Sequence, residues 1–220
     1  MSLYPDAFLL AFCGGGLVLS ARQLTGQARN FLLENDGPEL TQLQITVITV
    51  TFLCTGMMLT LSAMNQHITW SDAGRYIVLL AWGIPMVLLD MRNCWLPFRY
   101  TTGFWLSGLL FTFLPASPLT LMQALISSGV MFTLLYAFHA IAWRLRGEEG
   151  LGLGDVHLIA ALCAWFPWKQ ACALSGWAFF LLVITALLTR KRAQPYAPWL
   201  FALLSILAGN FSQPTLTGAL

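Results

Sequence analysis

Charged residues are scarce in this chain. Asp, Glu, Lys and Arg make up 9% of its 220 residues, whereas soluble domains carry about 25%. Because 58% of the residues are hydrophobic, the sequence predicts an integral membrane protein and excludes an ordinary soluble enzyme domain. The net charge of +2 is too small to indicate nucleic-acid binding.

Metal-binding patterns are missing as well. The five cysteines include no CxxC pair, and no HExxH motif is present, so we expect neither a structural zinc site nor another metal or cofactor. The first residues lack the charged start and small-residue cleavage site of a signal peptide, so none is expected.

Apolar runs between charges predict an all-α, polytopic fold with about eight transmembrane helices, because a span needs about 20 mostly apolar residues. The nine tryptophans are expected mostly at the membrane interfaces. We expect residues 1–220 to form a single membrane-embedded domain. The predicted spans are 6–21, 45–64, 74–90, 101–114, 119–143, 156–168, 170–189 and about 196–211.

The basic residues predict an orientation. With the N-terminus outside, all but two of the 11 Lys and Arg residues fall in inside loops, as the positive-inside rule requires. The two exceptions are Arg75 and Lys169. This orientation makes residues 22–44 a short cytoplasmic loop between the first two spans.

Two of the nine acidic residues lie at the ends of apolar runs. Asp90 closes the third span in "MVLLDMRNCWLP", and Asp155 opens the sixth in "GLGLGDVHL". Both belong to the inner face in this orientation, and ionisable groups at membrane boundaries are functional candidates. A pair of carboxyl groups that shares one proton supplies an acid and a base, so the pair is suited to peptide hydrolysis.

Three glycines precede Asp155 at alternate positions, Gly150, Gly152 and Gly154. Without side chains they would let an extended substrate backbone approach the acid, and Gly154 would supply a conformation closed to other residues.

Simpler interpretations of each feature remain. Asp155 would serve equally well as the N-cap of the sixth helix. Asp90 would form an ordinary ion pair with Arg92 or Arg99. The glycines would serve helix packing.

Three segments resemble motifs of one family. "GLGLGDVHLIAALCAWF" resembles the GxGD signature of the type 4 prepilin peptidases, "LLDMRNCWLP" resembles their other aspartate motif, and "QPYAPWLFAL" is similar to their proline-bearing C-terminal segment. Together these segments cover about residues 74–210.

The resemblance implies an aspartic endopeptidase without cofactor. Asp90 and Asp155 match the two catalytic aspartates of the family, whose members cleave a short basic leader from type IV pilin and type II secretion pseudopilin precursors. It further implies a multi-pass protein of the bacterial inner membrane whose partners are the prepilin precursor and the lipid bilayer, and whose N-terminus is periplasmic. Because the cysteine-rich cytoplasmic domain of longer members has no counterpart here, methyltransferase activity is not expected.

The chain departs from the family pattern at several positions. Phe98 replaces an aspartate and His157 a lysine, while Cys163, Pro167 and Ala197 stand at positions where the family has glycine. These departures keep open a catalytically degenerate partner of a pilus or secretion assembly. A small transporter with carboxylates at the membrane boundary is the other alternative.

Overall fold

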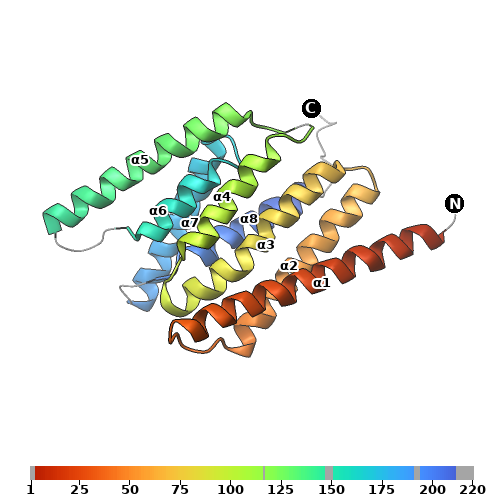
Figure 1. Cartoon of the computed structure of the whole chain (residues 1–220), viewed down its shortest axis with the longest axis horizontal. Coiled ribbons are helices and arrows are strands. Elements are labelled where there is room, and N and C mark those ends of the chain that lie inside the picture. The colour runs from red at the N-terminus through yellow and green to blue at the C-terminus, as the bar shows by residue number, and fades with distance from the viewer. Residues whose placement is uncertain (1–2, 116, 147–150, 191–193, 212–220) are drawn as a thin grey trace. The chain divides into compact units, whose positions relative to one another are not determined.

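The computed structural model describes residues 3–115, 117–146, 151–190 and 194–211. Over these ranges the chain is helical, without strands (Figure 1). The helices are α1 (Leu3–Glu34), α2 (Gln42–Met64), α3 (Trp70–Asn93), α4 (Phe98–Phe111), α5 (Leu121–Arg146), α6 (Leu153–Leu162), α7 (Trp168–Thr189) and α8 (Ala197–Phe211).

Five of these helices, α1, α2, α3, α5 and α7, are long and apolar enough to cross a membrane. Helices α4, α6 and α8 are shorter, with 14, 10 and 15 residues. The prediction of an all-α polytopic membrane protein is confirmed, and each predicted span coincides with a helix. Two helices, α1 and α6, differ from their predicted bounds by more than four residues at one end.

Helix α1 continues through Glu34, so residues 22–34 of the predicted loop 22–44 are helical. The loop was inferred from its charges, but the segment contains helix-forming residues and no proline, and Ala28 and Leu32 are buried. The helix ends where Asp36 adopts a left-handed φ of 50° and the N–H of Gly37 donates to the Leu32 carbonyl at 2.8 Å, a Schellman ending.

Helix α6 is shorter than the predicted span 156–168. It begins at Leu153 and ends at Leu162, followed by tight turns such as the one from the Trp165 N–H to the Leu162 carbonyl. Pro167 disfavours helical conformation in the residue before it. Ten residues of helix reach about 15 Å, half of the bilayer core of about 30 Å, so α6 does not cross a membrane alone.

The chain divides into two compact units. Unit 1 comprises residues 1–93 with residues from Phe201 onward, and unit 2 comprises residues 94–200. The expectation that 1–220 acts as one domain stays a prediction.

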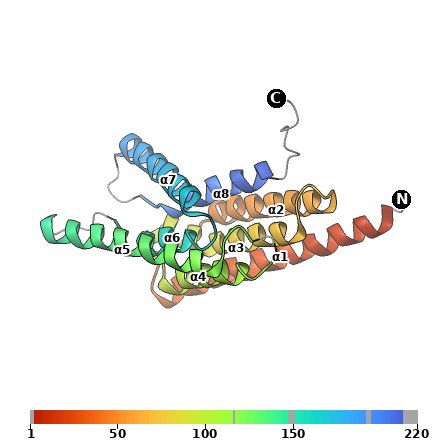
Figure 2. The same ribbon diagram turned by 90° about the horizontal axis from the view of Figure 1, so that it is seen from above.

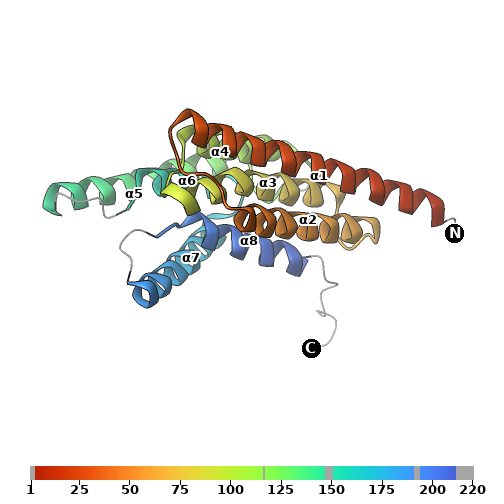
Figure 3. The ribbon, with the colours of Figure 1, turned by 90° about the horizontal axis from the view of Figure 1, so that it is seen from below.

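In unit 1, helices α1, α2 and α3 lie side by side (Figures 1 and 3). The N-terminal part of α1 runs beyond its two neighbours in Figure 3, and there Phe8 and Phe12 are exposed. Helix α2 starts with a capping box, in which the Gln44 N–H donates to the Thr41 hydroxyl at 3.4 Å. A Cβ on Gly56 would lie 2.9 Å from Leu17, so this glycine allows α2 to approach α1 closely.

In unit 2, the short helix α6 packs against both α4 and α5 (Figures 1 and 2). Its residues from Leu158 to Leu162, and the turn that follows to Phe166, are buried. Trp165 is 2% exposed, donates its indole N–H to the Phe104 carbonyl at 2.9 Å and stacks on the Phe104 ring. This tryptophan is a core residue and not the interface anchor expected of most tryptophans.

Candidate active site

Asp90 lies in the last turn of α3, in unit 1. The preceding residues from Gly83 onward are all buried, and Asp90 itself is 3% exposed. One of the two arginines considered as its partner, Arg92, donates its Nε–H to the Glu39 carbonyl at 2.6 Å. Helix α3 ends directly after, where Cys94 has a left-handed φ of 51°.

Asp155 lies in the first turn of α6, in unit 2. The N-cap of α6 is Gly152, so Asp155 is the third helical residue and the N-cap interpretation is wrong. The positive end of the helix dipole still favours a carboxylate at this position. In the described part of the chain no side chain or backbone N–H donates a hydrogen bond to this carboxyl group.

Burial raises the pKa of the Asp155 carboxyl group to about 7. Tyr196, between α7 and α8, is 1% exposed and donates its hydroxyl to the Ser175 carbonyl at 3.3 Å. Burial raises the pKa of the Tyr196 hydroxyl, and the nearby charge of Asp155 raises it further. The third motif, "QPYAPW", therefore comes within electrostatic range of Asp155, which the sequence alone did not indicate.

Two of the glycines before Asp155, Gly152 and Gly154, are needed for space and not for backbone conformation. Gly152 has a φ of −60° and a ψ of 138°, and Gly154, a helical residue, has no left-handed φ. The special conformation predicted for Gly154 is therefore wrong. Gly150 lies outside the described residues.

Both described glycines face close neighbours. A Cβ on Gly154 would lie 2.6 Å from the Leu96 Cβ and 3.1 Å from the Leu96 carbonyl oxygen. A Cβ on Gly152 would lie 3.2 Å from the Oδ2 of Asp155. Gly154 thus joins the GxGD segment to the Leu-Pro segment of the other motif, and Gly152 leaves room for the carboxyl group.

Two departures from the family pattern touch each other. The rings of Phe98 and His157 lie 5.2 Å apart in an edge-to-face arrangement. An aspartate and a lysine at these two positions would lie close enough to interact, so this chain has an aromatic pair in place of two opposite charges. Of the other departures, Cys163 caps the end of α6, Pro167 is the N-cap of α7, and Ala197 begins α8 fully buried.

In unit 2, Gly152 and Gly154 place Asp155 beside the Leu-Pro segment at Leu96. Tyr196, whose hydroxyl pKa is raised by burial and further by the charge of Asp155, belongs to the same unit. Asp90 belongs to unit 1. Among the described residues, no three His, Cys, Asp or Glu side chains meet where they would hold a metal ion. The chemistry available at either aspartate is proton transfer by a carboxyl group, which is buried at Asp90 and partly exposed at Asp155.

The fold is that of a multi-pass membrane protein. A family model described as the type IV leader peptidase family matches residues 77–209, which include both aspartates, and the chain belongs to this family. No solved structure matches the chain.

Curated relatives bear matching names. The "Type 4 prepilin-like proteins leader peptide-processing enzyme" of Escherichia coli O78:H11 is 33% identical over 112 residues, which are 50% of this chain and 42% of that protein. A "Prepilin leader peptidase/N-methyltransferase" of Xanthomonas campestris pv. campestris is 30% identical over 154 residues, 68% of this chain and 48% of that protein. The chain spans about half the length of the curated relatives it matches.

Proposed function

We propose that this protein is an aspartic endopeptidase that removes the basic leader from type IV prepilin or pseudopilin precursors, with Asp90 and Asp155 as its catalytic pair. One carboxylate takes a proton from the attacking water while the other carboxyl group protonates the carbonyl oxygen of the scissile peptide. The observation that carries the proposal is the setting of Asp155, a carboxyl group with a pKa of about 7 inside the family's GxGD signature.

The connection between the two motifs supports a shared site. Asp90 and Leu96 are six positions apart along the chain, and Leu96 contacts Gly154, the residue before Asp155. Six residues span about 20 Å when fully extended and less when partly helical. Covalent connectivity is therefore compatible with the proposed pairing of these two aspartates.

The substrate class comes from the family and its relatives, whose names refer to prepilin and prepilin-like leader peptides. Such a precursor would approach from the bilayer, which the five long apolar helices would span. Cleavage at the cytoplasmic face fits a basic leader, because the inner side of the membrane retains positively charged segments.

The proposed location is the bacterial inner membrane with the N-terminus in the periplasm. In a cysteine-free background, single cysteines placed in the segment Asn65–Ser71, which joins α2 to the start of α3, should react with a membrane-impermeant thiol reagent in intact cells. A cysteine at Gly147 should react only after the cells are broken. The reverse result would place both aspartates at the periplasmic face and overturn the cytoplasmic cleavage site.

Cleavage by purified protein tests the function. Asp90→Asn and Asp155→Asn should each abolish processing of a prepilin precursor, by at least a thousandfold, because an amide is neither acid nor base at neutral pH. Asp72→Asn is the matched control, since Asp72 starts the same helix as Asp90 and pairs with Arg75 at 3.5 Å. Its processing should stay within twofold of the wild type.

Each alternative predicts a different result. A degenerate assembly partner would bind the precursor but leave it uncleaved even as the wild-type protein. A transporter would neither cleave nor bind it, while the aspartate variants would abolish uptake of a solute into vesicles. Processing that survives either aspartate substitution would remove that residue from the catalytic pair.

A further inference from the structure

A histidine of α5 holds the backbone that leads into α6. The Nδ1 of His139 lies 2.7 Å from the carbonyl oxygen of Leu151, 12 positions further along the chain. A carbonyl oxygen only accepts hydrogen bonds, so Nδ1 carries the hydrogen and donates it. The bond therefore fixes the backbone directly before Gly152, the N-cap of α6.

His157 makes the same kind of bond on the other side of Gly152. Its Nδ1 lies 2.7 Å from the carbonyl oxygen of Leu153, the first residue of α6. The two carbonyls that flank Gly152 thus each accept a hydrogen bond from an imidazole ring. The bond from His139 is the one that comes from a different helix, so it ties the start of α6 to α5.

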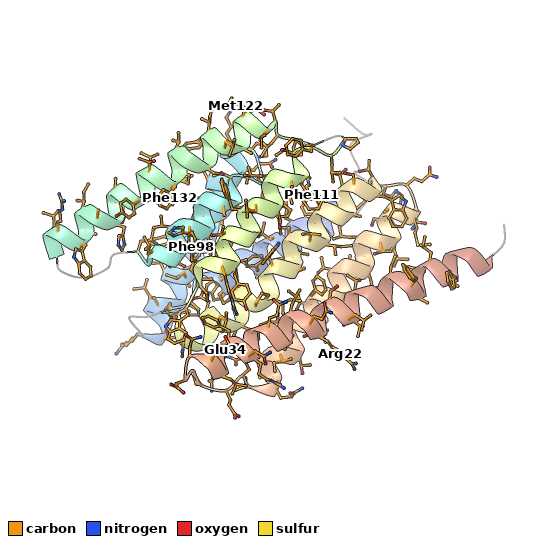
Figure 4. The ribbon with its side chains drawn as sticks, viewed as in Figure 1. Arg22, Glu34, Phe98, Phe111, Met122 and Phe132 are labelled. Carbon is orange, nitrogen blue, oxygen red and sulfur yellow. The ribbon has the colours of Figure 1, made fainter. Side chains whose placement is uncertain are left out.

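Aromatic rings of α5 support both imidazoles. The His139 ring stacks on that of Tyr136, with 6.2 Å between the ring centroids, and Tyr136 stacks on Phe132 at 5.7 Å. The ring of Phe132, labelled on α5 in Figure 4, also lies 5.0 Å from that of His157. Because Phe132 and Tyr136 are four positions apart, they share one face of α5. The orientation of His139 is therefore set by packing along this helix.

The start of α6 depends on support from outside the helix. Gly152 has no side chain with which to cap it, and the Val156 N–H donates to the Gly152 carbonyl at 3.1 Å to form the first turn. Side-chain caps normally satisfy the free N–H groups of a first turn, and a helix of ten residues is marginal alone. The bond from His139 stabilises the same turn by holding the residue before it.

This turn carries Asp155. A Cβ built on Gly152 would lie 3.2 Å from the Oδ2 of Asp155, so the backbone of Gly152 lies against the carboxyl group. Leu151, which accepts the bond from His139, is joined to Gly152 by a peptide bond. A shift of Leu151 would therefore reach the carboxyl group through a single residue.

We propose that His139 is a positioning residue, which holds the Leu151 carbonyl and thereby places the Asp155 carboxyl group for cleavage. The inference rests on the proposed function, in which Asp155 belongs to the catalytic pair. A misplacement of about 1 Å at a catalytic group costs about a hundredfold in rate. Loss of the bond should therefore lower kcat and leave KM nearly unchanged, because the carboxyl group acts in the chemical step.

Hydrogen–deuterium exchange tests the anchor without requiring cleavage. In the full-length protein in lipid nanodiscs, His139→Leu should speed exchange in peptides that contain Val156 about fivefold, the worth of one hydrogen bond. Peptides from α2 should exchange as in the wild type. His139→Asn should keep the wild-type rate at Val156, because its amide nitrogen stands near the place of Nδ1 and also donates.

Cleavage of a prepilin precursor tests the consequence for catalysis. His139→Leu should lower kcat about tenfold to a hundredfold, with KM within about twofold of the wild type. His139→Asn should restore most of this loss, and His139→Gln, whose amide lies one methylene further out, should restore less. Thr133→Ala is the matched control on α5, since its hydroxyl donates to the Gly129 carbonyl of the same helix at 2.8 Å, and it should match the wild type in both experiments.

Four outcomes would overturn the proposal. Wild-type exchange in His139→Leu would show that the bond does not hold the start of α6. Faster exchange with an unchanged kcat would show that the bond does not position Asp155. A loss of kcat that His139→Asn fails to restore would assign the effect to packing of the imidazole ring. A wild-type protein that cleaves no precursor would overturn the proposed function, and this role with it, whatever the exchange shows.

Discussion

The two aspartates occupy contrasting places in the molecule. Asp90 ends a run of buried residues near the C-terminus of the long helix α3 and is 3% exposed. Asp155 lies in the first turn of the short helix α6, is partly exposed and has beside it Gly152, whose missing side chain leaves it room. The same side chain is thus held by a long, span-length helix in one unit and by a short, enclosed helix in the other.

This contrast bears on how a pair of carboxyl groups would divide its work. Two carboxyl groups in equal surroundings compete for one proton. Unequal surroundings move their pKa values apart, so that one group acts as the acid and the other as the base. Asp155 has the positive end of a helix dipole and a pKa of about 7, whereas Asp90 stands at the other end of its helix. We infer that α6, which does not itself cross the bilayer, serves mainly to place and shield one carboxyl group.

Among substitutions that test how the two aspartates are held, Gly154→Ala should have the largest effect on stability and processing. In Gly154→Ala the new Cβ would collide with the Cβ and carbonyl of Leu96, at 2.6 and 3.1 Å, and neither belongs to a flexible side-chain end. Forcing atoms into packed sites costs about 1–3 kcal/mol, so the thermal midpoint of the detergent-solubilised protein should fall and processing should be lost with it.

Two other glycines sharpen this test. Gly176 in α7 has open space around it, so Gly176→Ala should leave the midpoint unchanged or raise it, since Ala favours a helix by about 1 kcal/mol. Gly152→Ala should displace the Asp155 carboxyl group and reduce processing with a smaller loss of stability. A Gly154→Ala protein as stable and active as Gly176→Ala would show that the contact with Leu96 does not hold α6 in place.

The hydropathy pattern predicted where the helices lie, because long apolar runs in a charge-poor chain have few other solutions. The hydropathy pattern gave the wrong bounds where a helix continues beyond the end of an apolar run. Helix α1 continues past Arg22 because residues 22–34 form a helix by propensity and bury Ala28 and Leu32. A loop inferred from the charges of residues 22–44 missed this.

The site was predictable only in its local parts. The positions of Asp90 and Asp155 at helix ends followed from the charge pattern. The contacts of Gly154 with Leu96 and the charge interaction of Asp155 with Tyr196 join residues more than 40 positions apart, which no periodicity reveals. The burial of Trp165 depends likewise on Phe104 in another helix.

A smaller effect is expected from pH. Below about pH 7 the Asp155 carboxyl group keeps its proton, and above this value it loses it. The proposed pair requires one shared proton, and the apparent pKa at which this proton is lost is a property of the pair and not of either aspartate. Processing at low substrate concentration should therefore fall about tenfold per pH unit on the alkaline side of an apparent pKa at or above 7. Rates that stay level or rise from pH 6 to 10, with an unchanged thermal midpoint, would contradict this role.

The smallest effect is expected from chelators. A chelator test distinguishes aspartates that act as an acid and a base from aspartates that bind a metal ion. As an acid and a base, the carboxyl groups act in unequal roles; as ligands of a bridging metal ion, they would act alike. Among the described residues no third His, Cys, Asp or Glu joins either of them in a metal-binding group, and Mg²⁺ or Zn²⁺ sites usually need more ligands than two carboxylates. Processing should therefore continue at an unchanged rate after incubation with excess EDTA or 1,10-phenanthroline. A loss of activity restored by one added metal ion, with both aspartate variants unable to respond, would replace the proton-sharing pair with a metal site.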